Sequence, residues 1–412
     1  MALKKRLIVA GLLCSFSTSS ALYSDDVISE ESVNSSESQL VQADSPPVLF
    51  APTPNAKPLN EVEKPDKQTQ TVSPTVKLSV DPIEPSITPS KPIVVVLPKQ
   101  QQDKQGTQFD SLLPETGLEG WSVHEGRQEA WQRDGDSVYC QGAGGGWLRT
   151  DKEYSDFHLK FDYRLQAGAN SGVGLRVPQE GNPTFTAVEL QLLDDSAPKY
   201  ASLRDDQYTG SLYYHVAPTQ KPQLLPVNEW NSCEVICKGD QMTIKLNGDI
   251  VNEINLAQPD EENQKESGAK WQLAKRPPLG RIALQSSSSR VDFKNLQIND
   301  LAVVTHSGVK YVELTTGEGE SLSDARQLTV HYVGQLLNGT RFGDTRDLGE
   351  PVTVPLEGII EGWKYGIAGM KVGGRRRLIV PPEMAYGSQG VANLIPPGAT
   401  LVFEVELCGF ER

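Results

Sequence analysis

Five aromatic residues near the C-terminal end of the chain are spaced to form an apolar slot. The surrounding alternation of apolar and polar residues directs their rings inward, and they are Tyr332, Phe342, Trp363, Tyr386 and Phe403. No acid, base or metal-ligand motif accompanies the rings, so a site built from them would act by shape and by excluding water. An ordinary core is the simpler interpretation of any one ring, and the five together favour a site.

Four polar residues in the middle of the chain suggest a second site, suited to hydroxyl groups. Arg149, Arg176, Glu189 and Gln191 are expected to share the polar face of a sheet. Guanidinium, amide and carboxylate groups suit the recognition of sugar hydroxyls, and Glu189 could serve as an acid or a base. The alternative is a polar sheet face in contact with solvent. No spacing of metal ligands is visible, so neither a metal nor a cofactor is expected.

The middle segment, residues 106–301, is expected to consist of short strands. Apolar and polar residues alternate from Phe157 to Leu165 and again from Val188 to Leu192. Asn247-Gly248 predicts a hairpin turn between two further strands. Many short strands with little helical periodicity predict an all-β sandwich.

The last segment, residues 305–412, is expected to combine strands with one helix. Residues 401–407 alternate as a strand, whereas Ile360, Trp363 and Ile367 recur at helical spacing. This pattern predicts an α+β domain, in which a curved antiparallel sheet packs against one short helix. The chain is therefore expected to hold two folded domains of different class.

Four sequence blocks follow one another in this last segment, and each contains one of the aromatic residues. They are His331–Gly334, Gly362–Gly366, Pro381–Gly387 and Ile395–Phe403. This string resembles the FKBP-type peptidyl-prolyl cis–trans isomerases over the full segment. The resemblance implies catalysis of X–Pro isomerisation in a pocket whose floor is Trp363.

The resemblance also implies the rest of that pocket. Its walls would be Tyr332, Phe342, Ile359, Ile360, Tyr386 and Phe403, with Leu394 and Ile395 on an overhanging loop. The N–H of Ile360 and the hydroxyl of Tyr386 would hold the carbonyl groups of the substrate backbone. Water favours the charge-separated planar amide, so a dry aromatic slot should favour the twisted transition state, which lies about 18–20 kcal/mol above it.

One strand of the segment departs from the family pattern. The family usually has Phe-Asp at the pocket rim and an arginine soon after, whereas this chain has Phe342-Gly343-Asp344 and then Leu348. A shift of one residue along a strand turns a side chain to the other face, so Asp344 is expected to point away unless a bulge near Arg346 compensates. Without compensation, isomerase activity and macrolide affinity would both fall. An inactive or chaperone-like domain is the alternative.

The middle segment resembles the 3-keto-disaccharide hydrolase-like domains, which have a concanavalin-type jelly-roll fold. The matching blocks are Gly144–Thr150, Asn170–Val173, Glu189–Asp195, Tyr208–Tyr213, Asn228–Asn231 and Gly280–Gln285. After Gln285 a family member would often have Asp, His or Gly, whereas this chain has Ser286–Ser289. That difference makes glycan binding a safer expectation than hydrolysis.

The N-terminal region has the pattern of an exported protein. A basic stretch, the apolar run Leu7–Leu13 and a small-residue site ending at Ala21 predict a signal peptide over residues 1–21, too short to span a membrane. Residues 22–105 are rich in Pro, Ser and Thr and predict a disordered linker, with Ile93–Leu97 as an apolar exception. We therefore expect a periplasmic or secreted protein.

The charge and the cysteines of the chain indicate which partners and which covalent bonds to expect. A formal net charge of −14 argues against nucleic acid as a partner. Four cysteines follow the predicted signal peptide, and free buried thiols are expected: Cys140, Cys233, Cys237 and Cys408. Four strand residues span about 13 Å, so Cys233 and Cys237 lie too far apart for a disulfide.

Three functions remain in competition at this point. The first is an exported prolyl isomerase that acts on proline-containing proteins and carries a glycan-binding or glycoside-processing domain. The second is a 3-keto-glycoside hydrolase whose FKBP-type segment is a folding or docking module. The third is a non-catalytic glycan-binding protein.

Overall fold

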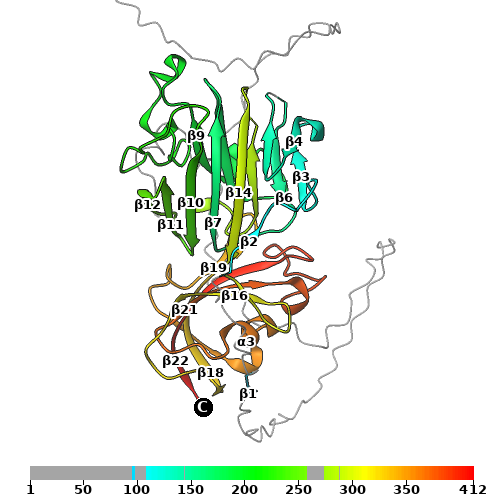
Figure 1. Ribbon diagram of the computed structural model, residues 1–412. Helices are drawn as coiled ribbons and strands as arrows, with labels where there is room; N and C mark the ends of the chain where they lie inside the picture. The colour runs from blue at the N-terminus through cyan, green and yellow to red at the C-terminus, as the bar shows by residue number, and fades with distance from the viewer. Residues whose placement is uncertain (1–94, 98–107, 143, 258–272, 287) are drawn as a thin grey trace, which may run out of the picture. The chain divides into compact units, whose positions relative to one another are not determined.

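The computed structural model describes residues 95–97, 108–142, 144–257, 273–286 and 288–412. The predicted signal peptide and nearly all of the predicted linker lie outside these ranges. The described part of the chain is mostly β-sheet with few helices, in which an all-β jelly-roll domain is followed by an α+β domain (Figure 1). The predicted fold class is confirmed.

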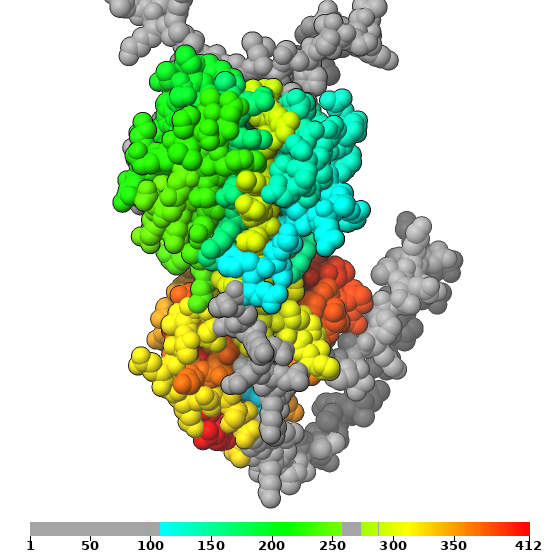
Figure 2. All heavy atoms as spheres, in the orientation of Figure 1, coloured from blue at the N-terminus to red at the C-terminus, as the bar shows by residue number. Residues whose placement is uncertain are grey.

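The jelly-roll domain is a sandwich of two antiparallel sheets. The larger sheet has the strand order β12-β11-β10-β7-β14-β5-β4, and β2 pairs with β14. Its strands are β2 (Asp110–Ser111), β4 (Trp131–Asp134), β5 (Ser137–Cys140), β7 (Phe157–Leu165), β10 (Asn231–Lys238), β11 (Gln241–Leu246), β12 (Asp249–Asn255) and β14 (Val291–Asp300). Strands distant in sequence thus lie side by side, as β14 in yellow shows between green and cyan residues (Figure 2).

The smaller sheet faces it and has the order β3-β6-β13-β8-β9. Its strands are β3 (Trp121–His124), β6 (Trp147–Thr150), β8 (Asn170–Val177), β9 (Val188–Leu193) and β13 (Arg281–Gln285). One turn of helix, α1 (Pro183–Thr186), precedes β9, and 3-10 turns lie at Gln128–Ala130, Pro198–Tyr200, Asp205–Gln207 and Leu273–Lys275.

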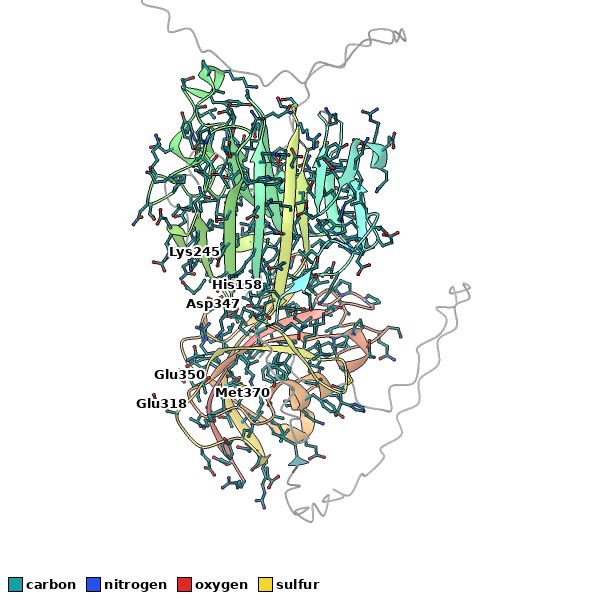
Figure 3. All side chains as sticks on the ribbon, in the orientation of Figure 1. His158, Lys245, Glu318, Asp347, Glu350 and Met370 are labelled. Carbon is teal, nitrogen blue, oxygen red and sulfur yellow. The ribbon has the colours of Figure 1, made fainter. Side chains whose placement is uncertain are left out.

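The predicted alternation along β7 explains the core of the sandwich. All five apolar residues of β7 are buried and belong to one hydrophobic cluster with residues of the other sheet, such as Leu190 and Leu284. Polar side chains such as His158 on β7 and Lys245 on β11 take positions between the buried ones (Figure 3). A period of two therefore gives β7 and β11 one buried and one polar face.

The C-terminal domain is a curved sheet with one short helix. The strand order is β15-β16-β21-β22-β18-β19, and β20 pairs with β18. Its elements are β15 (Val303–Val304), β16 (Lys310–Thr315), β18 (Gln327–Leu336), β19 (Arg341–Asp344), β20 (Val352–Pro355), α3 (Glu361–Ile367), β21 (Arg375–Val380) and β22 (Leu401–Glu411), with 3-10 turns at Leu356–Gly358 and Pro382–Met384.

Two glycines bring α3 into close contact with the sheet. A Cβ atom at Gly362 would lie 2.2 Å from a Val380 methyl group, and one at Gly366 would lie 2.7 Å from a Leu378 methyl group. Larger residues would push the helix away from β21, because these distances are shorter than any ordinary carbon–carbon contact. This packing places Trp363 over the sheet.

One segment of the predicted linker is ordered with this domain. Residues Val95–Val96 form strand β1, which pairs antiparallel with β17 (Asp324–Ala325). The N–H of Leu97 donates to the carbonyl oxygen of Ser323 at 3.2 Å, and the side chain of Leu97 is buried in the core of the domain. The expectation of disorder is wrong for residues 95–97, because the backbone of β1 pairs with a strand edge and the side chain of Leu97 is buried.

Candidate functional sites

The aromatic residues of the C-terminal domain pack edge to face around one point. The ring of Trp363 lies 5.4 Å from the ring of Tyr332 and 5.4 Å from the ring of Phe403, measured between centroids. The ring of Phe342 lies 5.6 Å from that of Phe403. All three pairs are nearly perpendicular, at 83–85°, an arrangement that aromatic rings prefer.

Four different elements bring these rings together. Tyr332 lies on β18, Phe342 on β19, Trp363 in the first turn of α3 and Phe403 on β22. Opposite Phe403, β18 has Gly334, where a Cβ atom would lie 2.6 Å from the ring of Phe342. The glycine in the His-Tyr-x-Gly block is therefore required by the close approach of the two phenylalanine rings.

The other predicted pocket residues lie in the same apolar cluster, with one exception. Ile359, Ile360, Tyr386 and Ile395 are buried members of that cluster. Leu394 is 36% exposed, on a turn closed by the N–H of Val391 donating to Ile395 at 2.8 Å. The structure thus brings the other predicted pocket residues together in one cluster. Leu394 lies at the periphery of this cluster, as expected of a residue on an overhanging loop.

Two polar atoms are buried in this pocket without a protein partner. The hydroxyl of Tyr332 and the Nε1 atom of Trp363 have no hydrogen-bond partner among the described residues. Burial raises the pKa of Tyr332 and raises that of Tyr386 to about 12, so both side chains keep their protons at neutral pH. An apolar box with unpartnered donors can accept a ligand that carries a carbonyl oxygen.

The rim of the pocket differs from the family pattern in the way the sequence indicates. In the β18–β19 register, Val333 lies opposite Asp344 and Gly334 lies opposite Gly343. Directly opposed residues share a face, so Asp344 lies on the face opposite to Tyr332. A bulge is present, but it comes before Gly343 and leaves Asp344 turned away.

The ion pairs of Asp344 fit this orientation. Its carboxylate lies 3.1 Å from the guanidinium of Arg341 and accepts the backbone N–H of Arg346 at 2.9 Å. Leu348 is 61% exposed. The structure therefore agrees with the expectation that Asp344 points away, and the alternative of compensation by Asp344 and Arg346 is not seen among the described residues.

In the jelly-roll domain, the carboxyl group of Glu189 on β9 is buried and only partly satisfied. Glu189 is 3% exposed, and its Oε1 atom accepts a hydrogen bond from Gln285 on β13 at 3.0 Å. The intervening strand has Gly172 at this point, where a Cβ atom would lie 2.8 Å from Oε1. The Oε2 atom is buried without a hydrogen bond of ordinary geometry among the described residues.

Burial gives this carboxyl group an unusual pKa. It raises the pKa of Glu189 to about 7, against the lowering effects of hydrogen bonds from Thr184 and Gln285 and of the charge of Arg276. A carboxyl group with a pKa near neutrality can donate or accept a proton at physiological pH. The predicted acid or base therefore has the environment that such a role requires.

Two cationic or titratable residues that sequence reasoning missed lie near Glu189. Arg276 contacts the imidazole Nε2 of His215 through Nη2 at 3.1 Å and also donates to the carbonyl oxygen of Phe185. Burial lowers the pKa of Arg276 to about 10, while Glu189 acts to raise it. Both residues lie in loops without periodicity, so the sequence carries no signal for them.

The other three predicted sugar-face residues divide between two environments. Gln191 follows Glu189 on the same face of β9 and donates to Asn170 at 3.0 Å. Arg149 on β6 donates to the carbonyl oxygens of Pro178 and Gln179, at 3.3 and 3.1 Å. Arg176 instead donates to the carbonyl oxygens of Ser155 and Gly239, at 2.7 and 2.9 Å. The two arginines therefore bind backbone rather than Glu189.

Three further properties concern the described residues only. No cluster of three or more His, Cys, Asp or Glu side chains there could hold a metal ion. None of the helices found there is long and apolar enough to cross a membrane. The four described cysteines are free thiols, as predicted, but only three are buried, whereas Cys408 is half-buried.

Two protein-family models match the chain. Residues 108–299 match the 3-keto-alpha-glucoside-1,2-lyase-like domain. Residues 318–408 match the FKBP-type peptidyl-prolyl cis-trans isomerase. Each match lies within one of the two domains that the sequence predicts.

Individual relatives match the C-terminal domain. The FK506-binding protein of Neisseria meningitidis serogroup B is 45% identical over 102 residues, which are 24% of this chain and 94% of that protein. The isomerase FkpA of Escherichia coli K12 is 36% identical over 130 residues, which are 31% of this chain and 48% of FkpA. The chain thus spans about half the length of FkpA.

A solved structure matches the jelly-roll domain. A protein from Parabacteroides distasonis, described as a proposed glycosyl hydrolase, is 28% identical with a TM-score of 0.41. The match covers 48% of this chain and 95% of that one.

Nearly the whole Neisseria protein aligns with the C-terminal domain of this chain at 45% identity. The chain therefore belongs to the FKBP-type peptidyl-prolyl cis–trans isomerases and carries a 3-keto-alpha-glucoside-1,2-lyase-like domain before its isomerase domain.

Proposed function

We propose that this protein is exported and accelerates X–Pro isomerisation in proteins that fold outside the cytoplasm, with its jelly-roll domain as a glycan-binding or glycoside-processing accessory. The observation that carries the proposal is the box of edge-to-face rings around Trp363, at 5.4 Å from Tyr332 and Phe403. Two donors in this box, the hydroxyl of Tyr332 and the Nε1 atom of Trp363, have no hydrogen-bond partner among the described residues. Proline-containing proteins are the proposed substrates.

The geometry favours the twisted amide over the planar one. The rings exclude water, which stabilises the charge-separated planar form, and they enclose the proline ring in a fixed orientation. The hydroxyl of Tyr386 and the N–H of Ile360, which precedes α3, would hold the flanking carbonyl groups. Each 1.36 kcal/mol of preference for the transition state raises the rate about tenfold.

Proline-limited refolding of a model protein tests the proposal, using the full chain as catalyst. Tyr386→Phe keeps the ring but removes the hydroxyl, and should reduce kcat/KM about threefold to tenfold. Leu348→Ala is the matched control, because Leu348 is 61% exposed. A parent chain that leaves the refolding rate unchanged would contradict the proposed isomerase activity.

The carboxyl group of Glu189 supports a second candidate function, the processing of a glycoside. Its pKa of about 7 and its Oε2 atom, which has no hydrogen bond of ordinary geometry among the described residues, suit proton transfer to or from a bound sugar. Turnover of 3-keto-glycosides by the full chain, compared with Glu189→Gln, tests this role, with Glu229→Gln as an exposed control. Glycan retention without turnover would instead indicate binding alone.

A further inference from the structure

The jelly-roll domain contains another cavity, at the end of the sandwich where β7 ends and β9 runs into the following loop. Its volume is about 470 Å³, within the range of small-molecule sites. Its walls are mainly aliphatic, formed by Leu165, Leu193, Pro222, Leu224, Leu225, Pro226 and Val227. No predicted sugar-face residue lines it.

One wall of this cavity is a loop, residues 221–227, that hydrogen bonds hold in place. The carboxamide oxygen of Asn231 is buried and accepts the N–H of Leu225 at 2.8 Å. The side chain of Asn247 donates to the same oxygen and to the carbonyl oxygen of Gln223, both at 2.8 Å. The N–H of Asn228 donates to Leu165 at 2.8 Å. The wall is thus pre-formed, which lowers the entropic cost of binding.

The polar part of the lining includes an unsatisfied hydroxyl group. Tyr163 is 1% exposed, lines the cavity, and its hydroxyl has no hydrogen-bond partner among the described residues. A buried hydroxyl without a partner is unfavourable, so it indicates a place for a ligand atom or a water molecule. Burial raises the pKa of Tyr163, so the group remains a neutral donor.

The charges in the lining select the ligand head group. Asp195 lines the cavity beside Asp194, and its Oδ1 atom accepts the hydroxyl of Thr209 at 2.9 Å. These two carboxylates disfavour an anionic ligand. Lys221 lines the same cavity and offsets one of these two negative charges. An ammonium group has no lone pair, so it could not accept a hydrogen bond from Tyr163. A neutral hydroxyl meets both requirements, because it can accept from Tyr163 and donate to Asp195.

We propose that this cavity binds a small, mainly aliphatic alcohol, with its hydroxyl group between Tyr163 and Asp195 and its apolar body against Leu224 and Val227. The site is separate from the isomerase pocket and from Glu189. Its ligand class differs from a sugar, because one hydroxyl group and aliphatic walls replace several polar groups.

Ligand-observed NMR titration of the full chain with cyclohexylmethanol tests the proposal. The alcohol should bind the parent, and Tyr163→Phe should weaken binding about threefold to tenfold, the effect of one neutral hydrogen bond. Leu224→Trp fills the cavity from the loop side and should abolish binding even if Tyr163→Phe alters the fold. Tyr139→Phe is the matched control, because it removes a hydroxyl group on β5 that donates to Gln132 and does not line the cavity.

Cyclohexanecarboxylate and cyclohexylmethylammonium test the charge argument with the same apolar body. Both should bind at least threefold more weakly than the alcohol. Equal or tighter binding of either ion would overturn the neutral head group. No binding of the alcohol, or unchanged binding by Leu224→Trp, would overturn the site itself. None of these outcomes depends on isomerase or glycosidase activity.

Discussion

Single residues set the chemical limits of the isomerase pocket. Among the described residues, the buried donor atoms of Tyr332 and Trp363 have no hydrogen-bond partner, and the carboxylate of Asp344 lies on the opposite face of the sheet. An unpartnered buried polar group costs about 1–3 kcal/mol. The pocket therefore has donors that a substrate can satisfy and no carboxylate of its own that would compete for them.

Gly343→Asp should return a carboxylate to the pocket side of β19, because Gly343 lies opposite Gly334 in the register. The new group would accept the Tyr332 hydroxyl and stabilise the rim. We expect macrolide affinity to rise about tenfold to a hundredfold, the range of one hydrogen bond to a charged group. Titration with a fluorescent macrolide measures it, with Gly343→Ala as the control that adds bulk but no acceptor. Equal affinities in all three proteins would show that the rim does not limit binding.

Glu189 makes the stability of the jelly-roll domain depend on pH. Its pKa of about 7 when folded lies above the ordinary value of 4.5, so the folded state holds a proton that the unfolded chain releases between these values. Stability should therefore fall as the pH rises from about 4.5 to 7, by roughly 3 kcal/mol at most.

Chemical denaturation of the parent and Glu189→Gln across this pH range measures that dependence. The glutamine is neutral at every pH, so the difference in unfolding free energy between the two proteins should change with pH. A constant difference from pH 5 to pH 8 would exclude a raised pKa at Glu189.

At the scale of elements, each domain depends on pairings between strands far apart in the chain. The isomerase domain even includes β1, which precedes the jelly-roll domain and pairs with β17. Leu97 next to it is 6% exposed and lies in the same apolar cluster as the pocket residues. The isomerase domain therefore extends beyond the segment that resembles its family.

Leu97→Ala should destabilise the isomerase domain by about 2–3 kcal/mol, since it removes a buried leucine side chain. Denaturant unfolding followed by the fluorescence of Trp363 measures this loss, with a background in which the other tryptophans are replaced. Val304→Ala is the control, because Val304 is 51% exposed. An unchanged unfolding midpoint in Leu97→Ala would mean that β1 contributes nothing to the domain.

At the scale of the whole molecule, the two domains have candidate sites of different chemical character. The isomerase pocket uses rings and neutral donors, whereas the jelly-roll domain has a carboxyl group that titrates near pH 7.

We predict that the whole chain is exported and that its N-terminal segment is then removed. Expression with the native N-terminus should give a product that begins after Ala21, and removal of residues 1–21 should leave the protein in the cytoplasm. N-terminal mass spectrometry and cell fractionation measure both outcomes. A mature protein that retains Met1 and remains in the cytoplasm would rule out the proposed location.

The sequence by itself determined the two fold classes and the members of the aromatic pocket. Period-two alternation predicts which face of a strand is buried. The four sequence blocks of the last segment predict the positions of the aromatic residues. Both signals are local properties of the chain, so they can be read from the sequence. The same alternation along a strand predicts that Asp344 points away from Tyr332, as the β18–β19 register shows.

Only the tertiary structure decided which distant segments meet. It joined β1 to β17, brought Arg276 and His215 to the neighbourhood of Glu189, and bound Arg149 and Arg176 to backbone carbonyl groups. It also left the hydroxyl of Tyr163 unpartnered in a cavity. These outcomes depend on loop paths and strand edges, which arise from packing over the whole chain and leave no periodic signal in the residues themselves.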